Sequence, residues 1–451
     1  MRLVERALGK RAAAFVRRPF RIFGGREGRE WRTVLYSVLL VFVVLGALAL
    51  PGAISGGAVV NYLVGLAFTL CLFALLGLGL QLQFGHGGIL NLGLIAFAGL
   101  AAYVMGIIWH HAGPGLAGAI EGSPGLQAAA LAAIALAAAA FSTPIAGLLV
   151  QRMRPQASTP TKRLAVAAVA AVAGLLAVGL FLPLEGQRAR DAVIVLGLLA
   201  GIAAAAGLAF LFAVPAIRLR ADYLAIVTLG AAELLESFYR NEIWLTNGTS
   251  GIVSIHNPIT ERALGNDMWR GLVEWVSTDL RPVGVAQVLV ALLALAYFYI
   301  LFEALVRSPW GRALRAVRED DAVAAALGKD VNRFRLQALI LGGVAVGAAG
   351  ILLALRTSTI FPGTFERAIT FSTWVALVVG GVANNKGVIA GAAIVMVALP
   401  ELARNLRALE ALGINDIVGP GQGVAAGVML ILVMMYRPHG LVGRKEELQF
   451  G

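Results

Sequence analysis

Long apolar runs separated by short polar connections make up most of the chain. The runs repeatedly reach the 18 or more residues that are typical of a membrane-spanning helix. Hydrocarbon offers no water to open backbone groups, so spanning segments must be helices or the strands of a closed barrel. The runs are rich in Leu, Ala and Gly and lack the period-2 alternation of barrel strands. The pattern therefore predicts an all-α fold, a polytopic transmembrane helical bundle.

The apolar runs predict about 10–12 spans, some of them broken by glycine. The membrane region extends over residues 33–437, between a basic N-terminal tail, 1–32, and a short C-terminal tail, 438–451. We expect the spans at about 33–51, 59–82, 88–109, 125–150, 164–183, 192–216, 222–239, 283–306, 336–355, 368–383, 387–403 and 421–437.

Composition and charge support this class. Hydrophobic residues make up 59% of the chain and charged residues only 14%, whereas soluble domains carry roughly 25% charged residues. The net charge of +12 does not indicate a nucleic-acid partner, because the basic residues form short clusters between apolar runs. Such clusters encode orientation in the lipid bilayer. Those at 151–163 and 307–335 indicate cytoplasmic connections, both termini are predicted on that side, and 240–282 is predicted to be an extracytoplasmic loop.

Two apolar runs in opposite halves of the chain are interrupted by glycine and asparagine, at 85–93 (GHGGILNLG) and 380–387 (GGVANNKG). In transporters such interruptions mark a site near the membrane midplane, because a broken helix frees backbone groups to bind solute. The alternative is tight helix packing or a connecting turn, and Lys386 favours a turn near water for the second. Asn91 must bond to a neighbouring helix or to solute. Candidate path residues here are Gly87, Gly88, Asn91, Gly93, Gly380 and Gly381.

The 307–335 segment has the pattern of a connection with structure of its own. It holds seven Lys or Arg and four acidic residues, and its positions recur at helical spacing before Gly328, where a helix would stop. The pattern predicts two short helices joined by a turn along the membrane face. The small residues around Ala324 suit docking against another protein, and a solvated loop is the alternative.

Several other polar residues favour local roles. Glu236 and Arg240, and likewise Glu303 and Arg307, are four residues apart, which predicts ion pairs on a helix surface. His86 has no second His, Cys or carboxylate at ligand spacing beside it, so the sequence indicates packing or capping and no metal site.

Six stretches of the chain resemble the permease subunit of bacterial branched-chain amino acid ABC importers. They occur in the family's order and are spread over the chain between residues 75 and 443. The stretches are LLGLGLQLQFGHGGILNLG (75–93), PAIRLRADYLAIVTLGAAELL (215–235), LTNGTSGI (245–252), WGRALRAVREDDAVAAALG (310–328), ALPELARNL (398–406) and MLILVMMYRPHGLVG (429–443).

The resemblance implies that 33–437 is the permease domain of an ATP-driven importer for branched-chain or related aliphatic amino acids. It implies a multi-pass protein of the bacterial cytoplasmic (inner) membrane. The implied partners are ABC ATP-binding subunits, a second related permease subunit and a periplasmic or extracellular solute-binding protein. Within the matching stretch 215–235, Thr228 and Glu233 join the candidate path, although Glu233 also fits an ion pair at the membrane interface.

The resemblance further implies that 307–335 is a coupling loop that contacts the ATPase. The chain itself has no Gly-x-x-x-x-Gly-Lys-Ser/Thr phosphate loop, so we expect ATP on the partner subunits, no cofactor on this chain and no enzymatic activity. The coupling residues implied are Arg312, Arg315, Arg318, Glu319, Asp320, Ala325, Ala326 and Gly328.

The chain also departs from the family's pattern. His86 stands where the family has an aromatic residue, Leu94 where it has histidine, and Ser372 where it commonly has an acid. Residues 125–190 add an extra hairpin of two spans, which preserves orientation. These departures leave the solute open. A urea or short-amide importer permease of the same family is one alternative, and an ion-coupled secondary transporter or a channel is an alternative from another class.

Overall fold

The computed structural model describes residues 56–123, 188–219, 221–277 and 279–401, with isolated residues near both ends of the chain (30, 33–39, 41, 42, 427, 428, 431, 435, 436, 440 and 441). They belong to two compact units, Ile54–Thr373 and a smaller one made of Met1–Ala53 with Trp374–Gly451. The expected spans 125–150 and 164–183, and with them the extra hairpin, lie outside the described residues, as does nearly all of 421–437.

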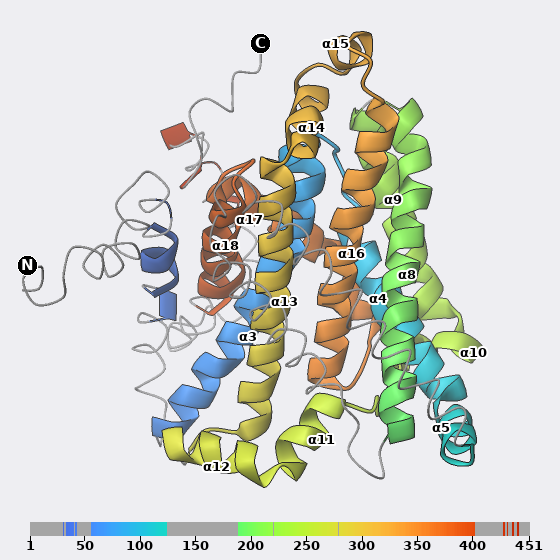
Figure 1. Ribbon diagram of the computed structural model, residues 1–451, viewed down its shortest axis with the longest axis vertical. Helices are drawn as coiled ribbons and strands as arrows, with labels where there is room; N and C mark the ends of the chain where they lie inside the picture. The colour runs from blue at the N-terminus through green and yellow to red at the C-terminus, as the bar shows by residue number, and fades with distance from the viewer. Residues whose placement is uncertain are drawn as a thin grey trace, which may run out of the picture. The chain divides into compact units, whose positions relative to one another are not determined.

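The described part of the larger unit is helical (Figure 1). Its long elements are α3 (Gly56–Leu80), which continues as a π-helix, η2 (Gln81–His86), then α4 (Leu94–Ile107), α8 (Arg188–Arg218), α9 (Ala221–Asn241), α13 (Pro282–Arg307) and α16 (Val331–Thr357). Its short elements are η3 (Ile108–Ala112), α5 (Gly113–Glu121), α10 (Ile243–Thr246), η4 (Gly248–Ser250), α11 (Pro258–Gly265), α12 (Asp267–Val276), α14 (Pro309–Glu319), α15 (Asp321–Ala326) and η5 (Pro362–Phe365). Among these residues the backbone forms no strand, only a bridge between Ile252 and Ile360.

Five described helices are long and apolar enough to cross a membrane, which confirms the predicted helical membrane fold. Four of them match expected spans to within about five residues. The predicted helix 88–109 instead begins at Leu94, because residues 87–93 leave the helix, and the helical stretch continues through η3 and α5 to Ile120. α9 fills the expected span 222–239 but is not among the five. The five are Ala58–His86, Leu94–Ile120, Ala189–Ala216, Pro282–Arg307 and Val331–Thr357.

The two ends of the larger unit carry different connections (Figure 1). α14 and α15 lie at one end, whereas α5, α10, α11 and α12 lie at the other. The segments 307–335 and 240–282 therefore lie at opposite ends of the larger unit, and their placement on opposite sides of the membrane stays a prediction. The expected loop 240–282 is itself largely helical, in α10, η4, α11 and α12.

Small residues let α16 pack backbone to backbone against its neighbours. A Cβ atom added at Gly342 would lie 2.6 Å from the carbonyl oxygen of Gly79 on α3, and one at Gly347 would lie 2.6 Å from Cβ of Ala205 on α8. A Cβ added at Gly350 would lie 2.1 Å from the carbonyl oxygen of Ala98 on α4. Membrane helices without a hydrophobic driving force between them associate through such close contacts. α16 is therefore held against three other helices of the bundle.

A buried ionic network joins α11 to the first turn of α8. His256 lies between two carboxylates, with Nε2 2.9 Å from Asp191 and Nδ1 3.0 Å from Glu261. Arg262 reaches the second oxygen of Asp191 at 2.9 Å. The Asn257 side chain caps α11 and also donates to the carbonyl oxygen of Leu355 on α16. This end of the larger unit is thus tied together by charge as well as by packing.

The smaller unit contains the second glycine cluster, as a turn between α17 (Arg367–Gly380) and α18 (Asn385–Ala392), which continues as η6 (Ala393–Ala398). The residues of α17 up to Thr373 belong to the larger unit. The predicted helix 368–383 ends at Gly380, because Gly381 and Ala383 have positive φ. A Cβ on Gly380 would meet the Gly387 carbonyl oxygen at 2.1 Å. The side chain of Lys386 is buried and pairs with Glu30 at 2.9 Å. The turn predicted at the second glycine cluster is therefore present, but Lys386 does not face water as the prediction required.

Candidate functional site

The first glycine cluster forms a break between η2 and α4. The chain leaves the π-helix at Gly87 and adopts positive φ at Gly88 (+69°), a conformation that costs most residues about 1–2 kcal/mol. Two amides still reach back, from Gly88 to the Phe84 carbonyl at 2.9 Å and from Ile89 to the Gln83 carbonyl at 3.0 Å. The predicted interruption of this span is therefore a defined turn of main chain.

The side chain of Asn91 is fully buried and forms hydrogen bonds across the break. Its Oδ1 accepts from the Gly93 amide at 2.9 Å, and its Nδ2 donates to Oε1 of Gln83 at 2.9 Å. Gln83 in turn donates from Nε2 to the Leu339 carbonyl on α16 at 3.1 Å. These bonds satisfy main-chain and side-chain groups that would otherwise be costly inside a membrane. Whether Asn91 also lines a solute path stays a prediction.

α9 and α17 complete the lining of the break. The Leu92 amide donates to Oγ1 of Thr228, which itself donates to the Ala225 carbonyl. Position 93 must be glycine here, since an added Cβ would lie 2.3 Å from the Thr228 carbonyl oxygen. At the start of α4 the Ile95 amide donates to the hydroxyl of Thr370 at 3.2 Å. Thr228 is therefore brought to the same place as Gly87, Gly88, Asn91 and Gly93.

The two short helices predicted in 307–335 are present as α14 and α15. Ser308 caps α14 by accepting from the Gly311 amide, and Asp320 caps α15 by accepting from the Val323 amide. α15 ends in a Schellman motif, with Gly328 at a φ of +76° and the Lys329 amide bonded to the Ala324 carbonyl. The expected stop at Gly328 is therefore confirmed.

α14 packs its apolar face on the bundle and its arginines reach main-chain oxygens. Leu314 is fully buried, and Arg315 donates to the carbonyls of Val306 and Gly311. Arg312 and Glu319 are exposed. On α15, Ala325 and Ala326 are exposed and only Ala324 is buried, so one face of this helix is not covered by the described part of the chain.

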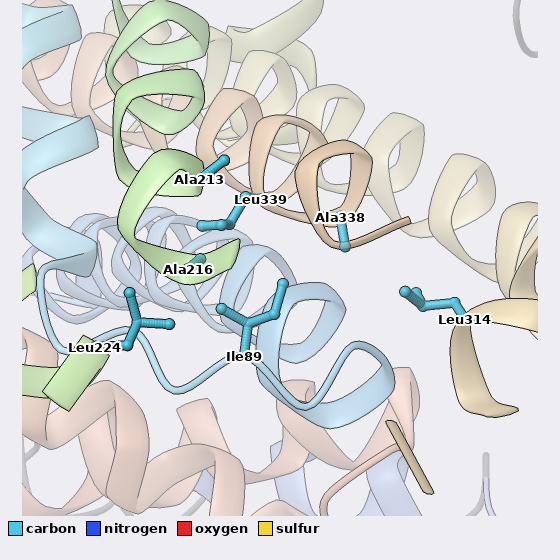
Figure 2. Packing of buried hydrophobic residues seen from close by; sticks show 7 residues of the cluster. All are labelled: Ile89, Ala213, Ala216, Leu224, Leu314, Ala338 and Leu339. Atoms are coloured by element: carbon cyan, nitrogen blue, oxygen red, sulfur yellow. The ribbon is translucent and has the colours of Figure 1, made fainter. Parts of the chain in front are cut away.

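Arg318 connects α14 to the break. Its Nη1 donates to the Gly85 carbonyl at the end of η2, and its side chain lies over Gly88, where an added Cβ would be 2.7 Å from Cγ of the arginine. Ile89 of the break belongs to a buried cluster with Leu314 of α14 (Figure 2). The cluster also contains Ala213 and Ala216 of α8, Leu224 of α9, and Ala338 and Leu339 of α16. α14 and the break therefore form one packed site.

Three candidate path residues are not part of this site as described. Glu233 lies further along α9 and pairs with Arg367 at 3.2 Å. Gly380 and Gly381 belong to the smaller unit. The two predicted helix-surface pairs are confirmed, Glu236 with Arg240 at 2.6 Å and Glu303 with Arg307.

Sequence reasoning missed Gln83 and the target of Arg318. Gln83 stands inside an apolar run, and a polar residue there is a signal that the sequence carried. In the described ranges no group of three or more His, Cys, Asp or Glu side chains could hold a metal ion. The site offers backbone dipoles, side-chain amides and one guanidinium, which are groups that can bind a polar solute or link the movements of two helices.

The membrane helices, the broken span and the amphipathic helix pair define a multi-pass membrane permease subunit. Residues 163–436 match the family described as branched-chain amino acid transport system / permease component. The match covers more than half of the chain, so the chain belongs to this family, whose members are transport components and not enzymes.

Curated relatives agree with this assignment. The chain is 27% identical over 417 residues to the high-affinity branched-chain amino acid transport system permease protein LivM of Escherichia coli (strain K12), covering 91% of this chain and 76% of that protein. It is 32% identical over 251 residues to LivM of Salmonella typhimurium (strain LT2), covering 54% of this chain and 56% of that protein. It is 26% identical over 226 residues to LivH of Escherichia coli (strain K12), covering 49% and 65%. No solved structure matches the chain.

Proposed function

We propose that this chain is the transmembrane permease subunit of an ATP-driven importer for branched-chain or related aliphatic amino acids in a bacterial inner membrane. The family match and the printed names of the LivM relatives support the solute class. ATP binds to separate ATPase subunits, and a solute-binding protein delivers the amino acid from outside. Both termini of the chain are cytoplasmic.

The contact between Arg318 and the break carries this proposal. An importer of this kind must convert movement of a soluble ATPase into movement of membrane helices. α14 and α15 project from one end of the bundle (Figure 1), and Arg318 and Leu314 join them directly to residues 85–89. A displacement of α14 is thereby passed to a segment whose main chain has already left the helix. The break then changes the side to which the path opens.

α15 offers the surface that the ATPase would bind. Val323 is 55% exposed and Leu327 is 74% exposed, and small side chains lie beside them. An apolar tip between charged residues fits a hydrophobic groove with a polar rim. The coupling residues Arg312, Glu319, Ala325 and Ala326 lie on this pair of helices and are not covered by the described part of the chain.

A second permease subunit is expected beside this one. The relatives of the chain include two different permease proteins, LivM and LivH, both of Escherichia coli (strain K12). With two related permease subunits around one path, each permease would carry a coupling surface of its own, and each surface would bind one of two ATPase subunits.

Reconstitution tests the proposal. The chain, its second permease and the ATPase subunits are placed in liposomes, and uptake of radiolabelled leucine is measured with the binding protein present. We expect uptake that requires ATP and that excess isoleucine suppresses but excess urea does not. Concentrative uptake by this chain alone, or uptake of urea in place of leucine, would contradict the proposal.

A further inference from the structure

A cavity of about 290 Å³ lies in the larger unit, next to the C-terminal part of α16. Its walls come from α3, α4, the last turns of α16, η5 and the first turn of α17. Small-molecule sites typically have volumes of roughly 300–1,000 Å³, so this one fits only a small solute. The lining is mainly apolar and includes Phe68, Leu72, Leu76, Leu353 and Phe365.

Arg356 provides the single charged side chain among the residues that line this cavity. Its Nη1 donates to Oε1 of Gln287 on α13, and its guanidinium carbon lies 5.0 Å from the centre of the Phe68 ring. Gln287 is itself only 5% exposed, and its hydrogen bond orients the half-buried guanidinium. In the part of the chain that the structure describes, no carboxylate pairs with Arg356. Its positive charge is oriented by neutral partners.

A charge in this position needs an explanation beyond anchoring. Basic residues at helix ends ordinarily extend toward the lipid headgroups, but Arg356 turns to a buried amide and an aromatic ring. Guanidinium groups bind carboxylates with two parallel hydrogen bonds, and this geometry is strongest where water is scarce. The hydroxyl groups of Thr69 and Thr364 also line the cavity and offer oxygen acceptors. Thr69 donates its own proton to the Gly65 carbonyl, which leaves its lone pairs available.

We infer that this cavity is a binding site for an aliphatic α-amino acid, with the solute carboxylate on Arg356. The side chain of the amino acid packs against Leu72, Leu76 and Phe365, and its ammonium group meets the threonine hydroxyls. The inference rests on the proposed function and adds a location and a mode of recognition to it. Urea has neither a carboxylate nor an apolar chain, so it would leave both halves of this cavity unused. Gln287 is a positioning residue, because it acts through Arg356.

Direct binding tests the site without the solute-binding protein. The assembled transporter in lipid nanodiscs is incubated with radiolabelled leucine, and displacement by valine, leucinamide and urea is measured. We expect valine to compete, whereas leucinamide, which lacks the carboxylate, and urea do not. Absence of specific leucine binding to the wild-type assembly, or equal competition by leucinamide, overturns the site.

Arg356→Gln is expected to weaken leucine binding at least tenfold, and Arg356→Lys to restore part of it. Arg270→Gln, at an exposed arginine of α12, is the control and should bind as the wild type does. Unchanged binding by Arg356→Gln overturns the site. Import of leucine separates the two proposals. If the wild type and Arg356→Gln import leucine equally, the binding site is contradicted and the proposed function stands. If the wild-type assembly imports no leucine, the proposed function itself is contradicted.

Leu72→Ala provides an independent test of the cavity if the Arg356 variants do not assemble. Removing this side chain enlarges the apolar part of the cavity, and a change of this size in a pocket alters selectivity by about tenfold or more. We expect the ratio of phenylalanine to leucine binding to rise by about tenfold. A merely structural role for Leu72 would lower binding of both amino acids equally, and that result overturns the assignment of the apolar wall.

Discussion

Arg318 is the residue that joins the membrane segment to the helix pair outside it. Its hydrogen bond goes to a main-chain oxygen of η2 and its methylene groups cover Gly88. Hydrogen bonds from a charged donor contribute about 1.5–3 kcal/mol each, which corresponds to a tenfold change in rate or more. One side chain is therefore sufficient to determine how tightly α14 and the break move together.

Replacing this arginine should uncouple the two parts. We expect Arg318→Gln to reduce ATP-dependent leucine uptake at least tenfold while the ATPase subunits still co-purify with the permease. Arg333→Gln, at an exposed arginine in the first turn of α16, is the matched control and should transport normally. Normal uptake by Arg318→Gln would show that the contact has no part in coupling.

At the scale of elements, the α15 tip depends on the left-handed residue that ends it. Gly328 has a φ of +76°, and an added Cβ would meet no other atom within 4 Å. Any effect of substitution there therefore comes from backbone strain and from the surface that the tip presents.

Two substitutions at position 328 separate these effects. Gly328→Val should abolish co-purification of the ATPase, because a β-branched residue resists positive φ at a cost of about 1–2 kcal/mol or more. Gly328→Asn should retain most of it, since asparagine tolerates this conformation. Equal behaviour of the two variants in a pull-down would argue against a role for the turn geometry.

Close helix packing also sets the stability of the bundle. Gly350→Ala should destabilise the protein by about 1–3 kcal/mol, because its Cβ would lie 2.1 Å from the Ala98 carbonyl oxygen. Gly207→Ala meets nothing within 4 Å and should be neutral or stabilise α8 by up to about 1 kcal/mol. Thermal unfolding in detergent compares them, and equal melting temperatures would contradict the packing argument.

For the whole molecule, sidedness is open to a labelling experiment. The chain has one cysteine, Cys71, which is buried and gives little background. Leu327 and Trp275 are 74% and 86% exposed, at opposite ends of the larger unit. A membrane-impermeant maleimide should label Trp275→Cys in spheroplasts, whose inner membrane is intact and accessible, and Leu327→Cys only in inverted vesicles. The reverse result would place α15 outside and exclude contact with a cytoplasmic ATPase.

The sequence predicted those features that depend on local pattern. Apolar runs predicted most of the spans, helical spacing together with Gly328 predicted α14 and α15, and the glycine cluster at 85–93 predicted an interruption of the helix there. Contacts between distant segments were beyond its reach: Arg318 and Gly85 are 233 positions apart, and Gln287 and Arg356 are 69 apart. Arg318 was predicted only as a residue that contacts the ATPase, and Arg356 was not singled out, because only packing decides which oxygen or ring such a side chain meets.

The position of the tight glycine contacts along α16 has a mechanical meaning. The helix has 27 residues, and Gly342 and Gly347 lie near its middle, whereas Leu339 near one end meets the break and Arg356 at the other lines the cavity. A helix that is tightly packed at its centre can tilt about that point, so that its two ends move in opposite directions. Tilting α16 by about 10° would carry its tips roughly 3.5 Å in opposite directions over a length of about 40 Å. One helix could thus widen the route on one side of the membrane while narrowing it on the other.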